Sequence, residues 1–170
     1  MKKHFLTLFT VAAVLASCGG NQQKEESGST ETESTTETPI GPTEAVNSNT
    51  VEVTGNDQMR FSVSEIRVKA GESITLTLKN AGTIAKEAMG HNLVVLQKGT
   101  NVEEFGQAAM NSKATDYIPE SLKSSIIAHT KLLGPNESDT ITFNLEKGEY
   151  DFICSFPGHY SSMRGKLIVE

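Results

Sequence analysis

Short segments in which apolar and polar residues alternate fill the chain from Thr50 to its C-terminus. The segment SITLTLKN, residues 73–80, places apolar side chains at every second position, and DTITFNL, residues 139–145, repeats this pattern. A period of two gathers those side chains on one face of a β-strand. Turn sequences such as TGND, KAGE, LGPNE and EKGE separate these segments from others rich in Val, Ile, Thr and Phe. The pattern predicts an all-β fold, an antiparallel β-sandwich with a single core.

One segment departs from this pattern: TNVEEFGQAAMNSK, residues 100–113. Thr100 and Glu103 have the spacing of a capping box, and apolar residues from Val102 onward recur at helical intervals. We expect one short helix here, followed by the loop ATDYIPESLKSS, residues 114–125. Together they would form a flap on the sandwich.

The first residues of the chain read as an export signal. Two lysines precede the apolar run Phe5–Leu15, which is too short to span a bilayer. Residues 15–18, LASC, resemble a bacterial lipobox, whose cysteine is acylated and becomes the mature N-terminus. We predict a lipoprotein signal peptide at 1–17 and lipid on Cys18, so the protein would be exported and anchored to a bacterial membrane, facing the periplasm or the cell surface. The alternative is an ordinary signal peptide with an accidental cysteine.

The composition separates a linker from a domain. Residues 18–45 hold Gly, Ser, Thr, Gln and Glu with almost nothing apolar, which predicts a disordered acidic linker of net charge −5. The predicted domain, 46–170, carries 12 Lys and Arg against 15 Asp and Glu. It has no basic cluster, which argues against nucleic acid as a partner.

The two cysteines restrict the chemistry. Lipid on Cys18 would leave Cys154 as the one thiol of the mature protein, so an internal disulfide cannot form. A lone thiol in an oxidising compartment is vulnerable unless it is buried or bound to a metal. The composition therefore favours a metal ligand or a structural buried cysteine.

The segment CSFPGHYSSM, residues 154–163, places Cys154, His159 and Met163 within one loop. Alternation in the preceding EYDFIC puts Cys154 on the same strand face as two aromatic residues, so we expect it to be buried. His91 lies far upstream, at the start of the predicted strand HNLVVLQ. Two strand ends at one pole of a sandwich could bring these groups together. A thiolate, two imidazoles and a weak thioether form the ligand set of blue-copper sites.

At these residues a family resemblance becomes visible. The motifs MGHN and CSFPGHYSSM, with GNDQM at 55–59 and IAHTKLLG at 127–134, resemble those of the azurins, small exported cupredoxins that transfer electrons. The similarity covers the chain from about Val51 to Glu170. It implies a cupredoxin-like Greek-key β-sandwich, a type 1 copper ion alternating between Cu(I) and Cu(II), and a single-electron carrier rather than an enzyme. It also implies redox partners such as c-type cytochromes or copper and haem reductases.

The resemblance assigns roles residue by residue. The equatorial ligands would be His91, Cys154 and His159, with the sulfur of Met163 and the carbonyl of Gly90 as weak axial contacts. The backbone amides of Asn92 and Phe156 would donate to the cysteine sulfur. Met89 and Met110 would belong to an apolar docking patch around His159. Because His159 follows Pro157-Gly158, we expect one edge of its ring to reach the surface.

The sequence also departs from the family pattern. The disulfide of the family is missing, and Asn49 and the turn Ala70–Glu72 occupy its positions. Leu93 stands where relatives often have a buried Trp. Tyr160 stands where relatives usually have a small residue, and we expect it at the rim without a role.

Other readings stay open at this point. A copper-storing or copper-delivering lipoprotein could use the same ligands, although storage proteins usually multiply such sites. An enzyme could use Cys154 as a nucleophile and His159 as a base, but no third group to orient the histidine is recognisable. A zinc site is possible, although Met is a poor zinc ligand. His129 could be proposed as a further nitrogen ligand, although such a histidine is mostly a surface or structural residue.

Overall fold

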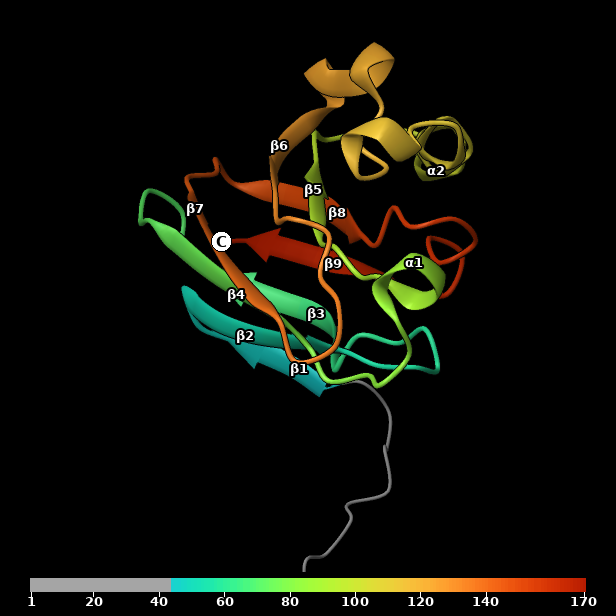
Figure 1. Ribbon diagram of the computed structural model, residues 1–170. Coiled ribbons are helices and arrows are strands. Elements are labelled where there is room, and N and C mark those ends of the chain that lie inside the picture. Colours follow the sequence, from blue (N-terminus) through green and yellow to red (C-terminus); the bar gives the residue numbers. More distant parts are fainter. Residues whose placement is uncertain (1–43) are drawn as a thin grey trace, which may run out of the picture. The chain divides into compact units, whose positions relative to one another are not determined.

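The computed structural model describes residues 44–170, which form two facing β-sheets with short helices at one side (Figure 1). The larger sheet has the order β1 (Glu44–Asn47), β3 (Val63–Val68), β9 (Arg164–Val169), β8 (Gly148–Ile153), β5 (Val94–Leu96) and β6 (Ile126–His129). The smaller sheet has the order β2 (Thr50–Gly55), β4 (Ile74–Asn80) and β7 (Ser138–Phe143). The predicted all-β sandwich is confirmed.

The direction of the strands corrects the expectation of a purely antiparallel fold. The pairs β1–β3, β3–β9 and β2–β4 are parallel, whereas β4–β7, β5–β6, β5–β8 and β8–β9 are antiparallel. Consecutive strands such as β2 and β3 lie in different sheets, so some neighbours within a sheet, such as β3 and β9, come from distant parts of the chain. Alternation of polar and apolar residues fixes which face is buried, but it carries no information on strand direction.

The apolar side chains form two clusters rather than the single predicted core. The larger cluster fills the space between the sheets, with Leu76 and Leu78 of β4 opposite Phe152 and Leu167 of the other sheet. The second cluster lies between β5 and the helices: Val94, Leu96, Phe105, Ile118 and Ile153. All three residues of β5 are fully buried, because a helix covers the face of that strand that the smaller sheet does not. In the sequence, such a strand reads as a continuous apolar run, so alternation cannot reveal that both of its faces are buried.

The helical flap is confirmed, with two corrections. Helix α2 (Val102–Met110) has Asn101 as its N-cap, whose side chain accepts from the amides of Glu103 and Glu104, so the predicted capping box at Thr100 is wrong. The hydroxyl of Thr100 instead donates to the carbonyl of Gln97. The predicted loop 114–125 contains much of two short 3-10 helices, η1 (Lys113–Thr115) and η2 (Glu120–Ser125), and a further helix α1 (Lys86–Met89) was not predicted.

Strand β1 begins at Glu44, inside the segment 18–45 that the composition assigns to a linker. The predicted signal peptide 1–17, Cys18 and the linker before Glu44 lie outside the described residues. Within residues 44–170, no helix has the length and apolar character needed to cross a membrane.

A pair of hydrogen bonds lies at the position where the family resemblance predicts a disulfide that this chain lacks. The side-chain oxygen of Asn49 accepts from the amide of Lys69 at 2.9 Å, and its nitrogen donates to the carbonyl of Lys69 at 3.2 Å. One side chain therefore joins the chain just before β2 to the chain just after β3. Asn49 supplies a non-covalent tie at the position of the missing bond.

Candidate metal centre

Three of the predicted ligands come from the loop that joins β8 to β9. The two strands remain paired up to Ile153 and Arg164, and beyond them the amide of Cys154 donates to the carbonyl of Met163 at 2.9 Å. Inside the loop, the amide of Met163 donates to the carbonyl of His159 at 2.7 Å. Gly158 has a φ of +82°, which glycine adopts without strain. The short loop thus brings three ligand side chains to one end of the sandwich.

His91 reaches the same place from a different part of the chain. Its backbone exchanges two hydrogen bonds with Leu133, of 3.1 and 2.7 Å, just before β5 begins. Its Nε2 lies 3.0 Å from the carbonyl oxygen of Asn56. Because a carbonyl only accepts, Nε2 must carry the hydrogen, which leaves the lone pair on Nδ1. That nitrogen faces the sulfur of Cys154.

The donor atoms converge in a buried space. The sulfur of Cys154 lies 4.0 Å from Nδ1 of His91 and 3.5 Å from Nδ1 of His159, and the three atoms lie within 4.8 Å of one another. In the described part of the chain this is the one group of three such residues found. Met163 is also fully buried, and a Cβ on Gly55 would lie 2.8 Å from its methyl carbon and 3.0 Å from the ring of His91. One thiol, two imidazoles and a thioether suit a soft metal ion.

Burial sets the charge of these groups. It raises the pKa of Cys154 to about 12, although hydrogen bonds from the backbone amides of Asn92 and Phe156 act in the opposite direction. Burial lowers the pKa of His159 to about 4, with a smaller contribution from repulsion by His91. The pKa of His91 is also lowered by burial, although its hydrogen bond to Asn56 and the charge of Asp57 raise it in part. At neutral pH the site holds a protonated thiol and two neutral rings, so a bound cation must displace one proton.

The side chain of Asn92 locks the two ligand segments together. Its oxygen accepts from the amide of Ser155 at 2.8 Å, and its nitrogen donates to the Ser155 hydroxyl at 2.8 Å and to the carbonyl of Asp116 at 3.3 Å. His91 and Cys154, the neighbours of these two residues, are therefore held at a fixed separation. The sequence pointed to the amide of Asn92 but missed its side chain and Ser155 altogether. A buried Asn next to a candidate ligand was the available signal.

His159 is less exposed than predicted. It is only 2% exposed, so the expected surface edge of its ring is almost entirely covered. The ring of Phe156 packs against it at a tilt of 43° and a centroid distance of 4.7 Å, and Tyr117 meets Phe156 edge-on at 5.0 Å. The exposed residue of this turn is Gly158. Pro-Gly indicated an exposed turn correctly, but not the direction of the next side chain.

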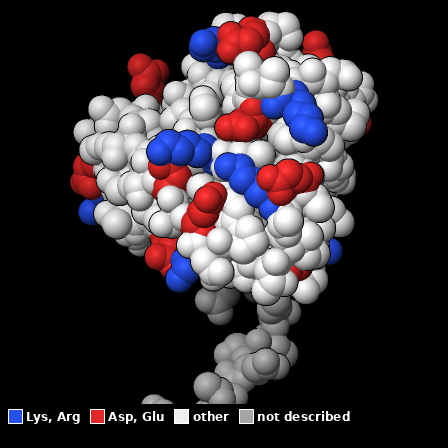
Figure 2. Space-filling view, in the orientation of Figure 1, with Lys and Arg blue, Asp and Glu red and all other residues white. Residues whose placement is uncertain are grey.

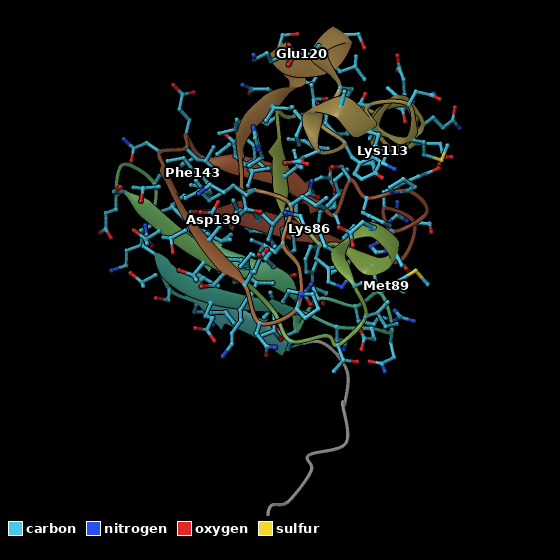
Figure 3. The ribbon with its side chains drawn as sticks, viewed as in Figure 1. Lys86, Met89, Lys113, Glu120, Asp139 and Phe143 are labelled. Atoms are coloured by element: carbon cyan, nitrogen blue, oxygen red, sulfur yellow. The ribbon has the colours of Figure 1, made fainter. Side chains whose placement is uncertain are left out.

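The remaining predicted residues lie around the centre. Met89 ends α1 (Figure 3) and is partly exposed, whereas Met110 at the end of α2 is 44% exposed. Gly90 is buried, and a Cβ there would lie 2.7 Å from the carbonyl of Lys86, so the backbone needs glycine. Its carbonyl as an axial contact stays a prediction. His129 is exposed on β6 and lies outside the ligand group.

Comparison with known proteins agrees with a site for a soft metal ion. Residues 47–170 match the family of copper binding proteins described as the plastocyanin/azurin family. Azurin-2 of Alcaligenes xylosoxydans xylosoxydans is 43% identical over 121 residues, which cover 68% of this chain and 92% of that protein. Outer membrane protein H.8 of Neisseria meningitidis serogroup B is 40% identical over 120 residues, or 68% of this chain. The match covers 64% of that relative, slightly less than two thirds of its length.

Two solved structures are also similar. Dithionite-reduced auracyanin from Roseiflexus castenholzii has a TM-score of 0.65 and 35% identity, covering 73% of this chain and 98% of that one. The azurin iso-2 of Methylomonas sp. strain J has a TM-score of 0.64 and 30% identity, covering 71% and 97%. The fold and the buried Cys-His-His group thus define a cupredoxin. Within that class, the chain belongs to the plastocyanin/azurin family of copper-binding proteins.

The cofactor of this family is copper, and the residues present fit it. His91, Cys154 and His159, with Met163 beside them, are positioned for a type 1 copper site. The hydrogen bond at Nε2 of His91 is an independent sign, because it frees the other nitrogen towards the thiol. The buried sulfur also receives two backbone hydrogen bonds, which stabilise its ionised form.

Proposed function

We propose that this protein is a single-electron carrier that shuttles electrons between exported redox proteins. Copper, when bound, supplies a one-electron couple between Cu(II) and Cu(I). The main support is the burial of every donor: Cys154 and Met163 are fully buried and His159 is 2% exposed. A site so enclosed suits transfer of an electron and leaves poor access for a substrate. The proposal therefore includes the absence of an enzymatic activity.

The protein holds the ligand side chains in positions that hardly need to change when an electron is gained or lost. The Asn92 side chain fixes the two ligand segments, and the carbonyl of Asn56 fixes the orientation of the His91 ring. Each ligand segment is also held by backbone hydrogen bonds, at Leu133 for His91 and at Met163 for Cys154. Ligands held in this way resist rearrangement when the charge of the ion changes. A small rearrangement is the condition for fast electron transfer.

Docking of partners is proposed to use apolar rather than charged contacts. On the face in Figure 2, acidic and basic side chains are interspersed rather than gathered by sign. Some are close pairs, such as Lys131 with Asp139 at 3.9 Å and Lys86 with Glu137 at 4.0 Å. Met89 and Met110 offer exposed apolar surface instead. Such a patch suits the small, transient contacts of redox pairs, for which c-type cytochromes or copper and haem reductases are the proposed partners.

The proposed location is the outside of a bacterial membrane, with lipid on Cys18. The basic and apolar start of the sequence and the lipobox-like LASC support export and acylation. One relative carries the name outer membrane protein H.8. Replacing Cys18 by Ala should move the protein from the membrane fraction to the soluble exported fraction. Retention on membranes after a high-salt wash would contradict the lipid anchor.

Copper storage or delivery with the same ligands is the second candidate, and one experiment separates the two. The purified protein is titrated with Cu(II), and its visible spectrum is recorded before and after mixing with a reduced c-type cytochrome. An electron carrier turns intensely blue through sulfur-to-copper charge transfer and bleaches reversibly while it keeps its copper. A delivery protein would instead give up the ion when a competing copper chelator is added in a second step. Cys154→Ser is the control and should lack the blue band; a blue Cys154→Ser protein would refute the site.

A further inference from the structure

Tyr160, the residue after His159, lies against helix α2. A Cβ on Gly106 would come within 3.0 Å of three atoms of the Tyr160 ring, so the ring rests directly on the helix backbone at that glycine. The Tyr160 hydroxyl donates to a carboxylate oxygen of Glu103 at 2.9 Å. The same oxygen accepts from the side chain of Gln107 at 3.0 Å. The tyrosine is thus held at its face and at its hydroxyl.

These contacts connect the ligand loop to the second apolar cluster. Tyr160 packs against the cluster that holds Phe105 of α2, whereas Cys154 and Met163 belong to the cluster between the sheets. The ring of His159 packs against Phe156 at a tilt of 43°, and Tyr117 supports Phe156. The histidine therefore has Phe156 against its ring, and its neighbour in sequence, Tyr160, is anchored on helix α2. Without Tyr160, the loop between Phe156 and Met163 would lose its tie to the helices.

We propose that Tyr160, Gly106 and Glu103 form a clamp that fixes the position of His159. They act as positioning residues, because none of them is a ligand. The inference deepens the proposed function, on which it rests, by naming what holds the ligand loop around His159 in place. A ligand whose neighbours are locked by packing and hydrogen bonds stays within a narrow range of orientations. Loss of the clamp would let His159 adopt several orientations and slow the electron transfer that depends on one of them.

The first test uses the protein without metal. Gly106→Ala replaces a poor helix former by the best one, so in a free helix it would stabilise. Here its methyl group would collide with the Tyr160 ring, and we expect a lower melting temperature by circular dichroism. In a Tyr160→Ser background the collision is gone, and the same Gly106→Ala change should raise the melting temperature. Equal effects in both backgrounds would overturn the clamp.

The second test uses the copper-loaded protein. Tyr160→Ser removes the ring and the hydroxyl, and should broaden the Cu(II) electron paramagnetic resonance lines and slow electron self-exchange about ten-fold or more. Tyr160→Phe keeps the ring on Gly106 and should restore most of both properties. A Tyr160→Ser protein with unchanged linewidth and exchange rate would refute the clamp. If the unmodified protein never turned blue, the proposed function would fail instead, and the metal-free test would still decide whether the clamp exists.

Discussion

Loading of the centre with Cu(II) should release a number of protons that burial of the ligands determines. The pKa of Cys154 is raised to about 12, so its thiol is protonated at pH 5.5. The pKa of His159 is lowered to about 4 by burial and by repulsion from His91, so its ring is neutral at that pH. The pKa of His91 is lowered as well, so at that pH its ring holds less of a proton than an ordinary histidine would. Between one and two protons should therefore leave for each copper bound.

This number differs clearly from that of an open site. Two histidines with an ordinary pKa of about 6.5 would be mostly protonated at pH 5.5, and together with the thiol they would release roughly 2.8 protons. At pH 7 the thiol alone remains to be ionised, which costs about 7 kcal/mol for a pKa of about 12. The metal–sulfur bond must offset this cost. The apparent affinity for copper should accordingly rise about ten-fold per pH unit around pH 7.

A pH-stat measures the release directly. Cu(II) is added to the metal-free protein in unbuffered, oxygen-free salt solution at pH 5.5, and the base needed to hold the pH is counted. Cys154→Ser serves as the matched control, and at saturating copper it should release about one proton less. A release near three would show that the histidines are solvated rather than buried. A release that Cys154→Ser leaves unchanged would show that the thiol is not a ligand.

Three further predictions concern the axial sulfur, the missing disulfide and the docking patch. Met163→Leu removes a weak donor and should raise the reduction potential, whereas Met163→Gln supplies a harder oxygen and should lower it; equal potentials by voltammetry would place Met163 away from the metal. Asn49→Ala removes both hydrogen bonds to Lys69 and should cost about 1–2 kcal/mol of stability, seen as a melting temperature lowered by roughly 4–8 °C in calorimetry. An unchanged melting temperature would mean that Asn49 does not compensate for the absent disulfide. Met89→Lys or Met110→Glu should slow self-exchange and transfer from a c-type cytochrome about ten-fold in stopped-flow and NMR measurements, because the new charge must lose its water at each encounter. The blue spectrum and potential should stay nearly unchanged, and undiminished rates would locate electron exit at another face.

The parts of this structure that sequence could predict are those with local signals. Alternating segments located most strands, and the spacing of Cys154, His159 and Met163 within one loop made the ligand set visible. Burial of Cys154 followed from its position at the end of a strand. His91 came from far upstream, and only its place at a strand start and the family resemblance pointed to it. Local signals of this kind can be read without knowing which distant segments are in contact in the folded protein.

The parts that sequence could not predict join residues distant in the chain. Tyr160 was expected to have no role, yet it bonds to Glu103, 57 residues away. Asn92 and Ser155 are separated by 63 residues, and nothing in the local sequence of either indicates that their side chains form a hydrogen bond. The depth of His159 depends in the same way on how Phe156 packs beside it. Tertiary contacts of this kind decide orientation, and local patterns do not contain them.

The parallel pairing of β1 with β3 has a consequence for orientation at the membrane. Glu44 pairs with Val63, β3 runs parallel to β9, and β9 begins directly after Met163. The chain therefore enters the domain at the pole that carries the metal ligands. With Cys18 acylated as proposed, 26 residues of chain separate the lipid from Glu44, and their maximal reach would be about 90 Å. The lipid would then be joined to the domain at its redox pole rather than at the opposite end.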